Sequence, residues 1–220
     1  PPRSTLSSSS AASDVYKRQI LTENPCFVGA LTVFETFGAE IHSIPIDKNG
    51  IDIEALKSKI ASLDRKPKFL YVTPNYHNPA GIIYSHERKK ALLEVLSGTG
   101  IILIEDDAYS DLYFDKGEQH LTKPMKSMGV PDVEIIYTGS FSKILGPGFR
   151  IGFMLSSEEI FEKAETIKQA LDACTSSFMQ ILANEFLAQH KLEPYLTFLR
   201  SEYLERKNLL QKHLKTYMPE

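Results

Sequence analysis

The segment at residues 139–150 reads GSFSKILGPGFR, and an apolar run flanks it on each side. The flanking runs, residues 134–138 and 151–155, have the length and composition of short buried strands. The glycine-rich connection between them carries hydroxyls, one amine and one guanidinium, which together can hold an anion beside a nucleophile. A lysine in a short motif is weak evidence by itself, because most surface lysines are only solvated charges.

The composition is that of an ordinary globular protein. The 220 residues are 42% hydrophobic and 24% charged, and the formal net charge of -3 gives no reason to expect a nucleic acid or an anionic membrane as partner. No apolar run approaches the roughly 20 residues that cross a bilayer. The two cysteines do not make a disulfide framework, and no cysteine–histidine cluster has metal-ligand spacing. We expect one sizeable core, no metal site and a reducing, cytoplasmic setting.

The first 19 residues differ from the rest of the chain. They are rich in serine, nearly free of large aliphatic side chains, and show neither helical nor strand periodicity. Residues 10–19, SAASDVYKRQ, resemble a translated adapter sequence, and a basic, serine-rich transit peptide is the alternative. We set residues 1–19 aside as a non-native or disordered segment, and expect the native chain to begin in mid-domain near Ile20.

From Ile20 onward, strand and helix patterns alternate. Short apolar runs typical of strands lie at residues 40–46, 69–72 and 101–104, and helical spacing covers residues 27–37, 53–63 and 85–95. Residues 158–170, residues 178–189 and a stretch that opens at Pro194 are predicted to be helical. The alternation predicts an α/β domain with a mainly parallel sheet covered by helices, followed by C-terminal helices.

Three polar clusters follow predicted strands of this sheet. They are the loop at residues 75–81, the segment at residues 105–109 and the segment at residues 139–150. In open α/β sheets, ligands bind beyond the carboxyl ends of the strands. The convergence of the three clusters at one such edge is more informative than any one of them.

Two side chains of these clusters have opposing interpretations. Asp106 ends an apolar strand, where burial favours the neutral acid; it either faces a cationic partner, such as a protonated ring nitrogen, or caps the next helix. Its acidic neighbours Glu105 and Asp107 would point to the opposite face, which disfavours paired carboxylates for hydrolysis. Lys143 is either a solvated charge or a desolvated, nucleophilic amine able to form a Schiff base.

The same ambiguity applies to the neighbouring clusters. Asn78 either donates to a phenolate oxygen or stabilises its own turn. Tyr109 either turns toward the same ligand or is a buried tyrosine with a satisfied hydroxyl. Ser140, Ser142 and Arg150 would supply donors for a phosphate if Lys143 lies in a cofactor site.

Taken in this order, the motifs resemble those of the fold-type I pyridoxal-phosphate enzymes, specifically the class I/II aminotransferases. The match covers roughly residues 21–220. The wording YVTPNYHNPAG, IEDDAYSDLYF and GSFSKILGPGFRIGF is most similar to the 2-aminoadipate/kynurenine/aromatic aminotransferase branch. The aminotransferase-like domain of MocR-type regulators has nearly the same motifs. The resemblance implies the α/β large domain of this fold type.

The resemblance assigns the cofactor chemistry to specific residues. Lys143 would form the Schiff base with pyridoxal 5'-phosphate and move the proton between the substrate Cα and the cofactor C4′. Asp106 would pair with the pyridinium nitrogen and keep the ring an electron sink. Asn78 and Tyr109 would hydrogen-bond the phenolic oxygen of the ring.

The remaining assignments by resemblance concern the phosphate and the ring face. Ser140, Ser142 and Arg150 would bind the phosphate. Phe27 would stack on the ring, in place of the tyrosine that many relatives carry. Asn78-Pro79 would be a cis peptide, as in relatives.

The resemblance also implies that the chain is a fragment lacking both ends. The glycine-rich phosphate loop of the family would lie upstream, and the arginine that binds the substrate carboxylate downstream of Glu220. We expect a partial cofactor domain at residues 20–156 and a helical segment at residues 157–220 that leads toward a truncated small domain. The isolated fragment should be inactive and prone to aggregation through exposed apolar surface. Relatives form homodimers, so a homodimer is implied for the full-length protein.

The function that the resemblance implies is ping-pong transamination between an amino acid and a 2-oxo acid. The competing interpretation is the effector domain of a MocR-type transcription regulator, which binds the cofactor without needing turnover; a DNA-binding segment ahead of residue 21 would distinguish it. A β-lyase or decarboxylase on the same scaffold stays open, as does a fragment unable to hold a stable site. No nucleic acid or membrane is expected to bind this fragment.

Overall fold

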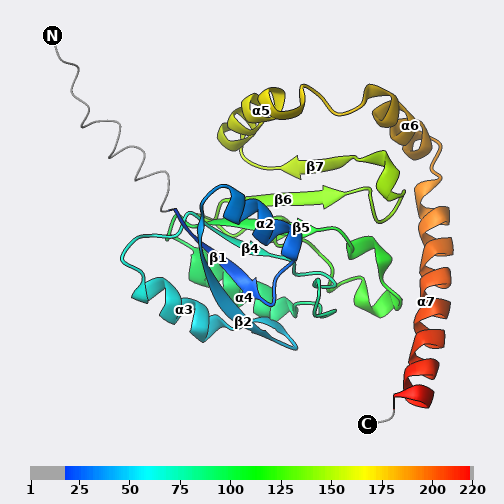
Figure 1. Ribbon diagram of the computed structural model, residues 1–220, viewed down its shortest axis with the longest axis horizontal. Helices are drawn as coiled ribbons and strands as arrows, with labels where there is room; N and C mark the ends of the chain where they lie inside the picture. The colour runs from blue at the N-terminus through cyan, green and yellow to red at the C-terminus, as the bar shows by residue number, and fades with distance from the viewer. Residues whose placement is uncertain (1–17, 219–220) are drawn as a thin grey trace. The chain divides into compact units, whose positions relative to one another are not determined.

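The computed structural model describes residues 18–218 of the chain (Figure 1). Residues 1–17 of the segment set aside as non-native lie outside this range. Gln19, the last residue of that segment, is the first residue of a buried strand, β1 (Gln19–Asn24).

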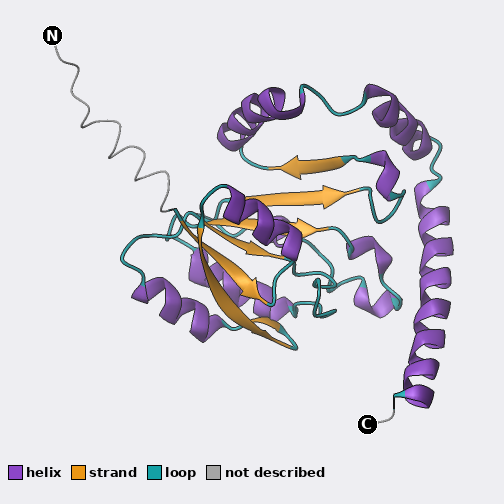
Figure 2. Ribbon diagram, in the orientation of Figure 1, coloured by secondary structure: helices purple, strands orange, loops and turns teal. Residues whose placement is uncertain are grey.

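Seven strands of the described residues form one sheet, in the order β3-β2-β1-β4-β5-β6-β7. Figure 2 shows the strands in orange and the helices in purple. β1 pairs in parallel with β2 and β4, β4 pairs in parallel with β5, and only the short β3 is shown to pair antiparallel, with β2. The mainly parallel α/β sheet predicted from the sequence is therefore confirmed. The other strands are β2 (Glu40–Asp47), β3 (Gly50–Ile51), β4 (Phe69–Val72), β5 (Ile102–Asp107), β6 (Ile135–Ser140) and β7 (Gly152–Leu155).

The described chain divides into two compact units. The first comprises residues 18–107, Pro124–Thr138 and Met154–Ser157, and the second comprises Ala108–Lys123, Gly139–Phe153 and residues 158–218. The division does not fall at one point of the chain, because residues 108–123 and 139–153 belong with the C-terminal helices. The boundary expected at residues 156–157 stays a prediction.

In the first unit, helices lie on both faces of the sheet. Alternation along β4 turns Leu70 and Val72 into the core, where they join side chains of α3 (Ile53–Ser62) and α4 (His86–Leu96). On the other face, Phe34 of α2 (Val28–Thr36) packs against Phe69 and Tyr71 with ring centroids 5.2 and 5.4 Å apart. A 3-10 turn, η3 (Met125–Met128), completes this unit.

The helix starts follow from capping side chains. Asp52 accepts a hydrogen bond from the Ala55 N–H at the start of α3, and Ser85 accepts one from the Arg88 N–H at the start of α4. Gly38, at φ 68, follows the end of α2 in the left-handed conformation that glycine adopts without strain.

The second unit holds the C-terminal helices and three 3-10 turns. Pro194 was expected to open the last helix, but α7 begins two residues earlier. No helix of the described chain is both long and apolar enough to cross a membrane. The elements are η1 (Ser110–Leu112), η2 (Lys116–Glu118), η4 (Pro147–Phe149), α5 (Glu158–Asp172), α6 (Ser177–Ala188) and α7 (Leu192–Tyr217).

Candidate active site

Asp106 lies in β5, in the first unit, and faces the side of the sheet that α2 covers. Its Oδ2 accepts a hydrogen bond from the Tyr71 hydroxyl at 2.5 Å, and its Oδ1 accepts one from Thr138 Oγ1 at 3.3 Å. Burial raises the pKa of Asp106 above its ordinary value, while these two hydrogen bonds lower it. The helix-cap interpretation is wrong, since the carboxylate is bonded to side chains of neighbouring strands.

Sequence reasoning missed Tyr71 and Thr138 as partners of Asp106. Tyr71 stands in the strand next to β5, paired with Ile104. Strand alternation could have placed Tyr71 on the same face as Asp106, once the pairing of β4 with β5 was assumed. Burial and the charge of Asp106 raise the pKa of the Tyr71 hydroxyl far above its ordinary value, so this group stays a donor.

The neighbours of Asp106 face the opposite side of the sheet, as alternation predicted. The carboxylate of the buried Glu105 accepts hydrogen bonds from the backbone N–H groups of Met125 and Lys126 at 2.7 and 3.0 Å. Asp107 accepts one from Asn75 Nδ2 at 3.0 Å. Both acids therefore serve the packing of the first unit and are not paired with Asp106.

Asn78 lies at the tip of a closed loop in the first unit. The His77 N–H donates to the Ile82 carbonyl at 2.8 Å, and the Ala80 N–H donates to His77 Nδ1 at 3.2 Å. The peptide between Asn78 and Pro79 is cis, as expected. Within residues 18–218, the half-buried Asn78 amide makes no hydrogen bond of its own. The turn is thus held by His77, and the Asn78 amide takes no part in closing it.

Phe27 precedes α2 and exposes 37% of its surface. Its ring lies over Gly29, where a Cβ would come within 2.5 Å of Phe27 Cζ. The preceding Cys26 thiol has its pKa raised to about 12 by burial, with further contributions from the charges of Glu23 and Asp106. The segment that carries Phe27 therefore lies within electrostatic reach of Asp106.

Lys143 and Tyr109 come together in the second unit. Lys143 Nζ lies 5.6 Å from the centroid of the Tyr109 ring. Neither the amine nor the Tyr109 hydroxyl has a hydrogen-bond partner within the described chain. Tyr109 is half-buried, so the fully satisfied, buried tyrosine is not what the structure shows.

Of the two interpretations left open for Lys143, the structure shows the solvated amine and not the desolvated one. Its side chain is exposed, because the lysine stands in a turn closed by the Leu145 N–H donating to the Phe141 carbonyl at 2.8 Å. The turn is held close to the following strand. A Cβ at Gly139 would lie 2.3 Å from Phe153 Cζ, which explains the glycine at this position.

The phosphate-binding candidates stand around this turn. Ser140 Oγ accepts a hydrogen bond from the Ser142 N–H at 3.1 Å, so the two serines are adjacent. Arg150 adopts φ 51, a left-handed conformation that is uncommon outside glycine and that concentrates at functional sites. Its guanidinium meets no carboxylate among the residues described.

These side chains fit the cofactor that the motifs imply. In the second unit, two cations and two hydroxyls stand on residues 139–150 without a bound carboxylate among the described residues, as a phosphate and a carbonyl carbon would require. In the first unit, Asp106 has no cationic partner and the Asn78 amide makes no hydrogen bond among the described residues. No group of three metal-ligating side chains occurs in the described part of the chain.

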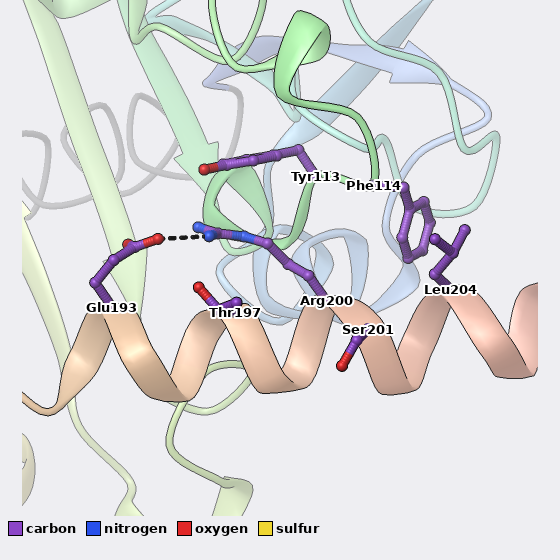
Figure 3. A pocket seen from close by; sticks show the side chains of 7 residues that line it. All are labelled: Tyr113, Phe114, Glu193, Thr197, Arg200, Ser201 and Leu204. Atoms are coloured by element: carbon purple, nitrogen blue, oxygen red, sulfur yellow. Dashed lines mark hydrogen bonds and ion pairs between the residues drawn. The ribbon is translucent and has the colours of Figure 1, made fainter.

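The second unit also contains a pocket between α7 and the residues after η1 (Figure 3). Arg200 lies over the Tyr113 ring, with its Cζ 3.9 Å from the centroid. Its Nε donates to the Asp111 carbonyl at 2.8 Å, and its Nη1 lies 2.7 Å from a Glu193 oxygen. The Arg200 guanidinium is thus bonded to groups of the protein, and we interpret the pocket as a gap between packed elements and not as a ligand site.

Comparison with known families places the chain. The family model for aminotransferase class I and II matches residues 9–219. The chain therefore belongs to the class I and II aminotransferase family, which confirms the resemblance seen in the motifs.

Individual relatives agree with this placement. The chain is 34% identical over 204 residues to aromatic-amino-acid aminotransferase 1 of Thermococcus litoralis, covering 91% of this chain and 48% of the relative. It is 34% identical over 201 residues to an HTH-type transcriptional regulator of Bacillus subtilis, covering 90% of this chain and 40% of the relative. The chain thus spans about half the length of the curated relatives it matches.

A solved structure shows the same fold. The kynurenine aminotransferase of Pyrococcus horikoshii, crystallised with PMP, superposes with a TM-score of 0.85 at 34% identity. The superposition covers 93% of this chain and 50% of the other. The fold-type I architecture expected from the sequence is confirmed.

Proposed function

We propose that the full-length protein is a pyridoxal-phosphate-dependent aminotransferase, which transfers an amino group between an amino acid and a 2-oxo acid by a ping-pong route. The observation that carries the proposal is the Lys143 amine. Among residues 18–218 its one recorded contact is with the Tyr109 ring, and it stands on a segment that also bears hydroxyl and guanidinium donors. An amine with no carboxylate partner is available for covalent chemistry, whereas a paired one is not.

Each side chain has a task in this proposal. Lys143 would hold the cofactor covalently through its amine and would move the proton released at the substrate Cα. Asp106 holds a protonated ring nitrogen, since a cation offsets the burial that raises its pKa. When bound, the cofactor supplies an electron sink for the charge left on the substrate. Asn78 and Tyr109 donate to the phenolic oxygen.

Four side chains bind and orient the cofactor without taking part in proton transfer. The hydroxyls of Ser140 and Ser142 donate hydrogen bonds to the phosphate. The positively charged Arg150 guanidinium offers the negative phosphate two parallel N–H donors. Phe27 covers one face of the ring. We also propose a homodimer, as in the family; a cytoplasmic location stays a prediction.

A second function is supported by one comparison. The Bacillus subtilis regulator matches this chain as closely as the aminotransferase of Thermococcus litoralis does, at 34% identity. The same side chains could bind the cofactor in a MocR-type effector domain, in which turnover is not required. Sustained turnover by the full-length protein with an amino acid and a 2-oxo acid would decide for the enzyme.

The test is the Lys143→Ala variant of the full-length protein, assayed with a panel of amino acids and 2-oxo acids. We expect turnover to fall by at least about a thousandfold, because the proton at the substrate Cα then has no acceptor. Lys57→Ala is the control, since Lys57 is exposed on α3 and pairs only with Glu54. Transamination at the wild-type rate in Lys143→Ala would contradict the proposal.

A further inference from the structure

A buried carboxylate stands beneath the loop that carries Asn78. Glu23, near the end of β1, has no exposed side-chain surface. Its Oε2 accepts hydrogen bonds from the Thr73 N–H at 2.9 Å and the Thr73 hydroxyl at 3.0 Å, and lies 3.1 Å from His77 Nε2. Its Oε1 accepts a hydrogen bond from the Tyr84 hydroxyl. Four groups from the loop thus converge on one side chain.

The state of His77 follows from its other nitrogen. Because Nδ1 accepts the Ala80 N–H, the ring proton of a neutral His77 sits on Nε2, the atom that faces Glu23. Nε2 is buried and makes no hydrogen bond of standard geometry within residues 18–218; the group that lies near it is Glu23 Oε2, at 3.1 Å. The Tyr84 hydroxyl stays protonated as well, because burial and then the charge of Glu23 raise its pKa well above the ordinary value.

The contacts to Glu23 span the whole loop. Thr73 opens it, His77 precedes Asn78, and Tyr84 closes it with its N–H donating to the Pro74 carbonyl at 2.8 Å. The tip is closed by the Gly81 N–H, which donates to the His77 carbonyl at 2.6 Å. Residues on both sides of Asn78 therefore contact the same carboxylate and fix the position of Asn78. The Asn78 amide itself contributes no hydrogen bond to this arrangement among residues 18–218.

We propose that Glu23 is a positioning residue of the cofactor site, which sets the Asn78 amide through His77, Thr73 and Tyr84. The inference rests on the proposed role of Asn78 toward the phenolic oxygen. Glu23 also lies only four residues before Phe27, so one buried group ties together two segments of the first unit that contribute to the site. No acid in this part of the chain had been singled out by its sequence pattern.

A carboxylate is required at Glu23 because both of its oxygens accept hydrogen bonds and neither donates one. A carboxylate offers about four lone-pair sites, and four groups approach it here. A glutamine in its place presents an N–H₂ group toward one of two sets of donors, so at least one contact on that side is lost. We expect Glu23→Gln to loosen the loop while leaving the rest of the first unit folded.

The experiment measures the pH midpoint of the absorbance change of pyridoxal phosphate bound to the full-length protein. A hydrogen bond to the phenolic oxygen favours its anionic form, so loss of the Asn78 contact raises the midpoint. We expect Glu23→Gln to raise it by about 0.5–1 pH unit. Removal of a buried negative charge would by itself lower the midpoint, so a rise cannot come from the charge alone.

A double-mutant cycle with Asn78→Ala makes the test specific. In the Asn78→Ala background, Glu23→Gln should produce no rise, because the contact through which Glu23 acts is already absent. No rise in the wild-type background, or an equal rise in both backgrounds, would overturn the proposal. Tyr84→Phe, which removes one donor and keeps the ring, should give a smaller rise in the same direction if Glu23→Gln does not fold.

Amide hydrogen exchange supplies a readout that needs no cofactor. In the cofactor-free protein, Glu23→Gln should speed exchange of the His77, Gly81 and Tyr84 amides at least about tenfold. The control is Glu105→Gln, an equally buried carboxylate that serves residues 125 and 126 and should leave these amides unchanged. Unchanged exchange in Glu23→Gln would sink the positioning role, whereas absence of any cofactor band in the wild type would count against the proposed function alone.

Discussion

Asp106 is a largely buried carboxylate that has no cationic partner among residues 18–218. Two hydroxyls, from Tyr71 and Thr138, bond the carboxylate, yet burial still raises its pKa. No lysine or arginine is paired with Asp106 within the described chain. A charged group arriving from outside would therefore relieve an unfavourable burial, which makes ligand binding and ionisation of Asp106 mutually supportive.

The Asp106→Asn variant tests this at the residue scale. A raised pKa means that the Asp106 carboxyl group holds its proton more tightly in the folded state than in the unfolded chain. The stability that this gives is present below the unfolded pKa of about 3.9, and it is lost as the pH rises through the pKa of Asp106 in the folded state. We expect the cofactor-free variant to lose less stability than the wild type when thermal unfolding is followed from pH 4 upward.

The same variant should fail with the cofactor. Without the negative charge, the ring nitrogen is no longer held protonated, and turnover should fall by at least about a hundredfold. Identical pH dependence of unfolding together with full turnover would refute the assigned role of Asp106.

Candidate site residues could be predicted from the sequence where they stand in a recognisable motif. They could not be predicted where their role depends on three-dimensional contacts. Lys143 and Asp106 were singled out by their positions after apolar strands. Whether the Asn78 amide was used by its own turn could only be decided by seeing that His77 holds the turn. The sequence left the exposure of Lys143 open, because glycine-rich surroundings in sequence do not specify which side chains cover an amine.

At the element scale, helix starts were predictable because their causes are local. Asp52 and Ser85 cap their helices through residues three positions away. β1 was not predicted as a strand, because its buried residues include Gln19, Thr22 and Glu23, which break the apolar run. Its position between two parallel strands, rather than its own pattern, makes it a strand.

The contact of α7 with η1 gives a prediction at this scale. Arg200→Ala removes the stacking on Tyr113 and the bond to the Asp111 carbonyl, and should cost about 1–2 kcal/mol of local stability. Exchange of the Leu112 amide, which bonds the Tyr109 carbonyl, should then quicken about five- to thirtyfold.

Arg206→Ala is the matched control on the same helix. The Arg206 side chain is 70% exposed and pairs with Glu202 at 3.6 Å, so its removal should change the Leu112 exchange rate little. Equal effects of the two substitutions would show that Arg200 does not hold the segment that follows Tyr109.

At the scale of the whole molecule, the chain spans about half the length of the relatives it matches. The family and the fold could be predicted because three ordered motifs define them. Substrate choice could not, because none of the three motifs is assigned to recognition of a substrate side chain.

The central claim is that Lys143 bonds the cofactor covalently. The most direct measurement is borohydride reduction of the full-length protein with pyridoxal phosphate, followed by peptide mass mapping. We predict an absorbance band that reduction abolishes and a phosphopyridoxyl adduct on the peptide containing Lys143. A reduced protein with no adduct, or with the adduct on another lysine such as Lys89, would contradict the account.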